Sequence, residues 1–200
     1  MRICFFGDSF INGVGDDGCL GWVGRLCSAE RKAGVDLTLY NLGVRGDTSA
    51  DVRRRWRLEA DLRLPAECDG RLVFSFGLND LAPIDERGAP RVAPAASLRD
   101  ARAILTEASA WRPTLMVGPL PVTQSQDRNT RIARFSDQLA ALCDELTVPF
   151  FSAVPFAEAF HATWRGEAEA GDGVHPNAGS YDALANAIRV WAPWRRWFAR

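Results

Sequence analysis

The 200-residue sequence lacks any apolar stretch long enough to cross a bilayer. The apolar run that begins the chain ends at Gly7, which is too short for the apolar core of a secretory signal peptide. These two absences predict a protein without stable membrane insertion. They also predict a cytoplasmic location, with the mature chain beginning at its first strand.

An excess of charge of either sign is missing as well, since 24 Lys and Arg residues face 25 Asp and Glu residues. A nucleic-acid partner would call for a basic surplus, so none is expected. The cysteines are few and form no Cys-x-x-Cys pair: Cys4, Cys19, Cys27, Cys68 and Cys143. Their odd number and scattered positions argue against a disulfide framework and a structural zinc site, and predict reduced thiols. No metal and no cofactor is expected.

Short apolar runs alternate with amphipathic segments along the whole chain. The expected strands are residues 2–6, 36–41, 71–76, 114–118 and 149–152. The expected helices are residues 22–33, 50–62, 95–110, 130–146, 156–164 and about 177–191, with Ser49 and Asn177 as N-caps. Several strands are uninterrupted apolar runs, as in strands buried on both faces. The alternation predicts one α/β domain over residues 1–200, with helices on both faces of a five-stranded parallel sheet.

In such open sheets, ligands bind beyond the carboxyl ends of the strands. The loops that follow the five strands contain residues 7–10, 41–46, 77–80, 119–129 and, after a further short helix, 171–176. Polar and glycine residues gather in these loops, which makes them the place to look for chemistry.

Acyl transfer by a serine enzyme needs an exposed hydroxyl, a base, a group that orients the base, and donors for the oxyanion. Ser9 lies in a glycine-led turn after the first strand, and His175 is one of only two histidines. Asp172, three residues before His175, can hold the Nδ1 proton of the ring. The backbone N–H of Ser9, the unobstructed backbone N–H of Gly43 and the side-chain amide of Asn79 are the expected oxyanion donors.

Four blocks of this sequence resemble the GDSL family of esterases and lipases, also called SGNH hydrolases. They are Gly7-Asp8-Ser9, Gly43, the Gly-Leu-Asn-Asp block at residues 77–80, and the Asp-Gly-Val-His-Pro block at residues 172–176. The blocks follow the family's order from residue 7 to residue 176, so the resemblance spans nearly the whole chain.

The resemblance implies a flavodoxin-like three-layer α/β/α fold, the SGNH hydrolase fold. It also implies metal-independent hydrolysis of small-molecule carboxylic esters or thioesters through an acyl-enzyme. By the same resemblance Ser9 is the nucleophile, His175 the base and Asp172 its partner, while Ser9, Gly43 and Asn79 donate to the oxyanion.

Simpler interpretations compete with some of these roles. Ser9 alone could be a helix cap. Asp8 and Asp80 are expected to support the turn and the loop rather than the chemistry. The Glu158 to His161 segment repeats the acid-to-histidine spacing, so His161 is a rival base. Its place in a short amphipathic helix favours an exposed pair instead.

Two other motifs resemble known sites without the expected context. Residues 13–18 spell the dinucleotide-binding pattern Gly-x-Gly-x-x-Gly, but the pattern lies several residues beyond the strand and carries two Asp residues that would repel a pyrophosphate. We interpret it as a flexible loop beside the active site. Ile11 stands where a Gly-x-Ser-x-Gly elbow needs its second glycine, which argues against the α/β-hydrolase fold.

The sequence leaves the substrate open. Carbohydrate O-deacetylation would use the same residues, and a catalytically inactive binding module on the same fold is a further alternative. The polar, proline-rich loops at residues 85–94 and 119–129 disfavour a true lipase. The Trp- and Arg-rich residues 191–198 are expected to pack against the domain, with a dimer contact or a weak membrane anchor as the alternative.

Overall fold

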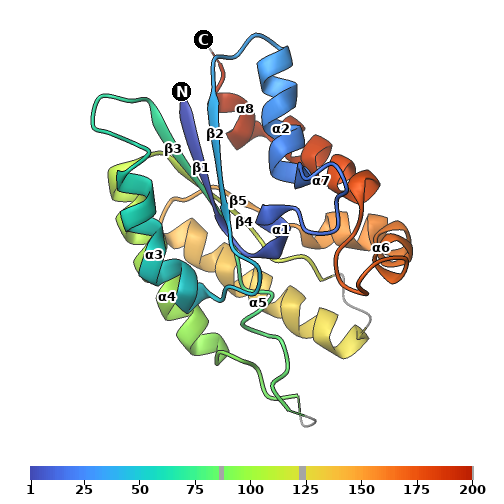
Figure 1. Cartoon of the computed structure of the whole chain (residues 1–200). Coiled ribbons are helices and arrows are strands. Elements are labelled where there is room, and N and C mark those ends of the chain that lie inside the picture. Colours follow the sequence, from blue (N-terminus) through green and yellow to red (C-terminus); the bar gives the residue numbers. More distant parts are fainter. Residues whose placement is uncertain (86–87, 122–124, 200) are drawn as a thin grey trace.

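The computed structural model describes residues 1–85, 88–121 and 125–199, and in this part of the chain five strands alternate with eight helices (Figure 1). The strands are β1 (Arg2–Gly7), β2 (Thr38–Gly43), β3 (Gly70–Ser75), β4 (Thr114–Val117) and β5 (Phe150–Phe151). All of them pair in parallel, in the order β2-β1-β3-β4-β5. The predicted α/β class and five-stranded parallel sheet are therefore confirmed.

Helices cover both faces of this sheet. They are α1 (Ser9–Asn12), α2 (Gly21–Lys32), α3 (Ser49–Asp61), α4 (Pro94–Trp111), α5 (Gln126–Glu145), α6 (Val154–Glu169), α7 (Ala178–Val190) and α8 (Ala192–Arg196). Figure 1 shows α3, α4 and α5 on one side of the sheet, with α2, α6, α7 and α8 on the other. The arrangement is the three-layer α/β/α fold expected from the sequence.

Adjacent side chains of β1 serve the two opposite layers, because successive residues of a strand point to opposite faces. The ring of Phe5 lies 5.8 Å from that of Trp22 in α2, and the ring of Phe6 lies 6.3 Å from that of Trp56 in α3. All four residues are at most 1% exposed. The continuous apolar run of β1 is thus explained by burial on both faces.

Some helix boundaries differ from the predicted ones. Thr48, rather than Ser49, is the N-cap of α3, because its side chain accepts the N–H of Asp51 while the Asp51 carboxylate accepts the N–H of Thr48. Asn177 caps α7 as predicted, by accepting the N–H of Gly179. The helices α5 and α6 are longer than expected, and α5 has Ser125 as its N-cap, five residues before the predicted start.

The carboxyl ends of β1, β2 and β3 lie level with one another, since Gly7 pairs with Gly43 on one side and with Ser75 on the other. The segments that leave these strands therefore meet at one edge of the sheet. The two polar, proline-rich loops predicted at residues 85–94 and 119–129 are described only in part, because residues 86–87 and 122–124 lie outside the described residues.

The Trp-rich C-terminal segment packs against the rest of the chain, as expected. Trp194 in α8 is 1% exposed, contacts Phe5 at a ring distance of 6.3 Å, and donates its indole N–H to the buried carboxylate of Glu30. Among the helices in the described ranges, none combines the length and apolar character that a membrane span requires.

Candidate active site

Ser9 is the first residue of α1, directly after β1. Asp8 is the N-cap of this helix and accepts the N–H of Phe10 at 2.9 Å, so Ser9 is not the cap. The turn between strand and helix is tight enough to require glycine at position 7, where a Cβ would lie 1.9 Å from the carbonyl oxygen of Ser75. Ser9 thereby projects from the carboxyl edge of the sheet while remaining only 5% exposed.

The loop before α7 brings His175 and Asp172 to this serine. Nε2 of His175 lies 2.7 Å from Oγ of Ser9, and Nδ1 lies 2.7 Å from Oδ2 of Asp172. Because the Asp172 carboxylate can only accept, Nδ1 carries the proton and Nε2 is free to accept the hydroxyl proton of Ser9. The ring of Phe10 packs against the imidazole at 5.2 Å and helps to enclose it.

The Asp172 carboxylate is fixed by several donors. Its Oδ1 accepts the backbone N–H groups of Val174 at 3.0 Å and His175 at 2.9 Å. Desolvation alone would raise the pKa of Asp172, but the hydrogen bonds from His175 and Val174 outweigh it and hold the pKa well below its usual range. Arg45, which the sequence did not single out, also reaches Oδ2 at 3.0 Å from the loop after β2.

Asn79 lies in the loop after β3 and faces both neighbouring loops. Its Nδ2 donates to the carbonyl oxygen of Asp47 at 3.0 Å and to Oδ2 of Asp8 at 3.2 Å. The amide is thus placed beside the segment that leads into Ser9, with its hydrogens shared among protein acceptors.

The two supporting aspartates are deeply buried and differ in their partners. Asp80 is fully buried and accepts hydrogen bonds from the backbone and hydroxyl of Ser49 and from the hydroxyl of Ser97, which ties the loop to α3 and α4. Burial, helped by the nearby charges of Asp80 and Asp47, raises the pKa of Asp8 to about 7 although the N–H of Phe10 opposes the rise.

Gly43 and Gly46 both belong to the segment after β2, and their N–H groups differ. The N–H of Gly43 donates to Oδ1 of Asn41 at 3.1 Å, and a Cβ at Gly43 would lie 2.3 Å from the backbone nitrogen of Asn12. Gly43 is therefore needed for the close approach of α1. Gly46, with φ of +87°, is the third residue of a turn over residues 44–47, and its N–H has no acceptor among the described residues.

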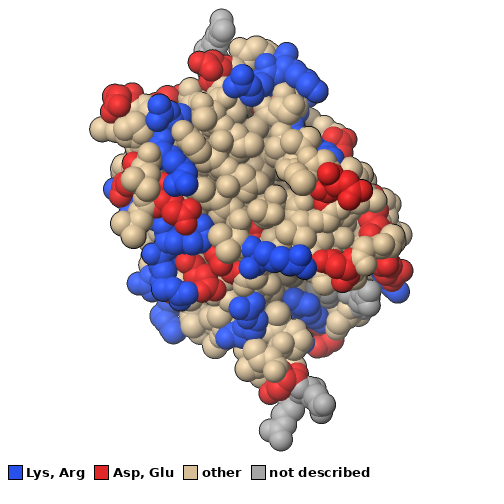
Figure 2. All heavy atoms as spheres, viewed as in Figure 1, with Lys and Arg blue, Asp and Glu red and all other residues tan. Residues whose placement is uncertain are grey.

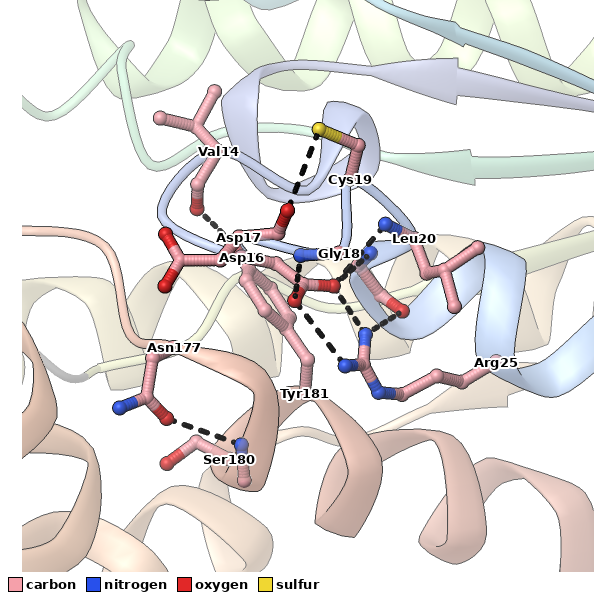
Figure 3. Close-up of polar contacts among 12 residues, drawn as sticks. Val14, Asp16, Asp17, Gly18, Cys19, Leu20, Arg25, Asn177, Ser180 and Tyr181 are labelled. Carbon is pink, nitrogen blue, oxygen red and sulfur yellow. Dashed lines mark hydrogen bonds and ion pairs between the residues drawn. The ribbon is translucent and has the colours of Figure 1, made fainter.

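The glycine-rich segment over residues 13–18 is held in place by Asp16, so the prediction of a flexible loop is wrong. The Asp16 carboxylate accepts three backbone N–H groups and pairs with Arg25 (Figure 3), the backbone donors being Gly18, Leu20 and Gly21. Gly15 in this segment approaches the loop of His175 so closely that a Cβ would lie 2.4 Å from the carbonyl oxygen of Pro176. The segment packs against the loop of His175, and its backbone N–H groups bind Asp16 where a dinucleotide site would need them for phosphate.

The rival histidine lies elsewhere. His161 and Glu158 line a pocket of about 430 Å³ between α5 and α6, together with residues such as Gln126 and Val154. The hydroxyl of Ser9 is bound by His175 instead. Within the described ranges, no three His, Cys, Asp or Glu side chains gather in a way that could hold a metal ion.

Comparisons with known proteins identify a family and a shared fold. A model of the GDSL-like Lipase/Acylhydrolase family matches residues 5–183. Among curated protein sequences, nothing matches. An acetylxylan esterase from Geobacillus stearothermophilus superposes with a TM-score of 0.75 at 19% identity, covering 94% of this chain and 91% of that one. A lipase/acylhydrolase from Enterococcus faecalis superposes with a TM-score of 0.77 at 19% identity, covering 97% and 96%. At these identities the two structures show a shared fold.

Proposed function

The chain belongs to the GDSL-like lipase/acylhydrolase family, and from this premise we propose that Ser9 is the nucleophile that cleaves carboxylic esters or thioesters of small to medium acyl groups. The family makes the protein an ester hydrolase. The observation that carries the residue assignment is the chain of two 2.7 Å contacts from Ser9 through His175 to Asp172.

Acylation follows from this arrangement. Nε2 of His175 takes the hydroxyl proton as Oγ of Ser9 attacks the carbonyl carbon of the ester, and the carbonyl oxygen becomes an oxyanion. Asp172 keeps the ring oriented and stabilises the imidazolium. The imidazolium then gives its proton to the departing alcohol, which leaves an acyl group on Ser9.

Water completes the cycle. His175 takes a proton from a water molecule as the water oxygen attacks the acyl carbonyl, and it returns that proton to Oγ of Ser9 when the carboxylic acid leaves. His175 thus passes on each proton that it accepts within the same half-reaction, to the alcohol during acylation and to Ser9 during deacylation. No metal or cofactor enters any of these steps.

Three N–H groups are proposed to stabilise the oxyanion. The first is the backbone N–H of Ser9, which as the first residue of α1 has no acceptor within its helix. The second is the Nδ2 group of Asn79, a side chain that can exchange its hydrogen bond to Asp8 or Asp47 for one to the oxyanion. For the third we assign the N–H of Gly46 in place of Gly43, because the N–H of Gly43 is already bound by Asn41. Loss of one such donor typically lowers kcat about 100- to 1,000-fold.

Deacetylation of a carbohydrate is the second candidate, and it uses the same residues. The observation in its favour is the fold shared with an acetylxylan esterase over 94% of the chain. An inactive binding module is disfavoured by the short Ser9–His175 contact, which a binding role would not require. A cytoplasmic location and the absence of nucleic-acid partners stay predictions, and a homo-oligomer stays one of the alternatives that the sequence leaves open.

The test is turnover of nitrophenyl esters of graded chain length beside a panel of acetylated sugars. Ser9→Ala and His175→Ala are expected to lower kcat by at least about 10⁴-fold on every substrate, and a fluorophosphonate probe should label wild type but not Ser9→Ala. His161→Ala is the matched control and should retain full activity. Undiminished turnover in either triad variant would refute the assignment, and the preferred panel decides between the two substrate classes.

A further inference from the structure

Arg128 stands out among the arginines near the candidate active site. It lies near the start of α5, half-buried, and its Nη2 donates to the carbonyl oxygen of Leu78 at 3.3 Å. Its Nε is buried and has no hydrogen-bond partner in the part of the chain that the structure describes. In the described ranges no Asp or Glu pairs with Arg128, whereas the neighbouring Arg131 pairs with Asp127 at 3.2 Å.

A partly buried cation without a counter-ion is costly. Burial, together with the charge of Arg131, lowers the pKa of Arg128. With the described residues the side chain makes one hydrogen bond, although a guanidinium has five N–H donors. An incoming anion would supply the missing charge and the missing acceptors.

The position of Arg128 relates it to the reacting atoms. Leu78 directly precedes Asn79, so the guanidinium is bound to the loop that carries a proposed oxyanion donor. Asn79 in turn reaches Asp8, the neighbour of Ser9, at 3.2 Å. Two hydrogen bonds, from Arg128 to Leu78 and from Asn79 to Asp8, thus connect Arg128 to the neighbour of the nucleophile.

Arg91 binds the neighbouring segment, which follows β2. Its Nη1 donates to the carbonyl oxygen of Gly46 at 3.0 Å, and the next residue, Asp47, accepts the amide of Asn79. No carboxylate of the described residues pairs with Arg91, which is exposed. Figure 2 shows separate Lys and Arg side chains spread over the lower half of this face, in front of the segment after β2 and of α5.

Among the described residues, four carboxylates near this edge have other partners. Asp8 and Asp80 are buried under the loops, at 3% and 0% exposure. Asp47 pairs with Arg55 at 2.7 Å, and Asp172 is bound by His175 and Arg45. None of these four carboxylates therefore accepts a hydrogen bond from Arg128 or Arg91.

We propose that Arg128, together with Arg91, forms a subsite for an anionic group of the substrate, so that the enzyme prefers esters bearing a carboxylate or phosphate. The planar guanidinium fork suits both anions. The inference rests on the proposed hydrolysis at Ser9. The anion can belong to the acyl part or to the alcohol part of the ester, and the experiment separates these two sources.

The experiment compares three nitrophenyl esters of similar reactivity. They are neutral 4-nitrophenyl acetate, mono-4-nitrophenyl glutarate with the charge on the acyl part, and 5-acetoxy-2-nitrobenzoate with the charge on the alcohol part. The variants are Arg128→Met, which keeps the apolar stem, Arg128→Lys, Arg91→Met, and the matched control Arg134→Met, which removes an exposed arginine from the same helix.

Wild type should favour one anionic ester, and Arg128→Met should lower kcat/KM for that ester about 10- to 100-fold while the neutral ester changes less than about threefold. Arg128→Lys should recover part of the loss, Arg91→Met should show a smaller loss, and Arg134→Met should show none. The ester that responds identifies the charged part of the substrate.

An equal loss on charged and neutral esters would mean that Arg128 only supports the Leu78 carbonyl, and it would overturn the subsite. Equal kcat/KM values of wild type for all three esters would overturn it too. Binding of glutarate, measured by calorimetry on wild type and Arg128→Met, separates the two proposals. If no ester is turned over but glutarate binds only wild type, the subsite stands and the proposed function falls; if glutarate binds neither, the subsite falls.

Discussion

The substitution Asp16→Asn tests how the His175 loop is supported. Asp16 is 5% exposed and holds three backbone N–H groups and Arg25, whose side chain is 17% exposed (Figure 3). An asparagine has nearly the same shape, but it turns an NH₂ group toward donors and leaves the Arg25 guanidinium without a counter-charge. The change therefore removes the interaction without creating a cavity.

Two independent figures give the size of the effect. Breaking a largely buried ion pair by removing one partner costs about 3–5 kcal/mol. The hydrogen bond from Arg25 is the largest cause that lowers the pKa of Asp16, from 3.8 to about 2, and a shift of that size corresponds to about 2 kcal/mol. We expect a loss of about 3 kcal/mol at pH 7, which lowers Tm by about 6–12 °C for a chain of this length.

Thermal unfolding followed by circular dichroism at several pH values is the assay. The pKa of Asp16 is depressed in the folded state, so its contribution is fully present above pH 4 and is lost as the pH falls toward 2. The gap in Tm between wild type and Asp16→Asn should therefore narrow over that window. Asp17→Asn is the matched control, since Asp17 is exposed and its carboxylate has no partner among the described residues.

A gap in Tm below about 2 °C at pH 7 would refute this account of the loop. A gap that stays constant from pH 7 to pH 2 would show that the carboxylate charge is not what Arg25 and the backbone donors recognise. An equal effect of Asp17→Asn would point to the general charge of the loop instead.

Two further predictions concern glycine roles and a buried acid. Gly43→Ala, whose Cβ would lie 2.3 Å from the nitrogen of Asn12, should lower both Tm and kcat. In Gly46→Ala the new Cβ meets no atom within 4 Å, and the change should lower kcat about 10- to 100-fold at a stability cost of about 1 kcal/mol. Gly34→Ala, at a similar φ of +91°, should show that stability cost alone. Alanine keeps the backbone N–H, so full activity of Gly46→Ala would contradict the expected shift of the turn that directs this N–H. Asp8→Asn should raise stability by a few kcal/mol at pH 8 but not at pH 4. Burial raises the pKa of Asp8 from 3.8 to about 7, so wild type loses stability as the pH rises from 4 to 7. Equal changes in Tm at pH 4 and pH 8 would contradict this effect of burial.

Local pattern was enough to predict the architecture. Uninterrupted apolar runs such as Ile3 to Phe6 identify strands buried on both faces, and their alternation with helices leads to a parallel sheet. The boundaries were less well predicted where capping decided them. Thr48 and Ser49 are both good caps by residue type, and only the reciprocal bond with Asp51 selects Thr48.

The site divides in the same way. Residue types and loop positions were sufficient to nominate Ser9, His175 and Asp172. The fold places the ring of His175 2.7 Å from Ser9 on one side and 2.7 Å from Asp172 on the other. The direction of a single backbone N–H was not predictable. Gly43 and Gly46 look equally open in the sequence, and they differ only because Asn41 and α1 crowd the first.

By itself the sequence determined the fold class, the edge of the sheet that carries the chemistry and the residue types gathered there, because these follow from local periodicity and from the common direction of parallel strands. Only the tertiary structure decided which groups are paired, buried or left without a partner. Arg45 meets Asp172 across 127 positions of the chain, and Arg128 meets Leu78 across 50. Such contacts depend on the relative placement of whole loops, which packing of the two helical layers against the sheet sets and no local pattern encodes.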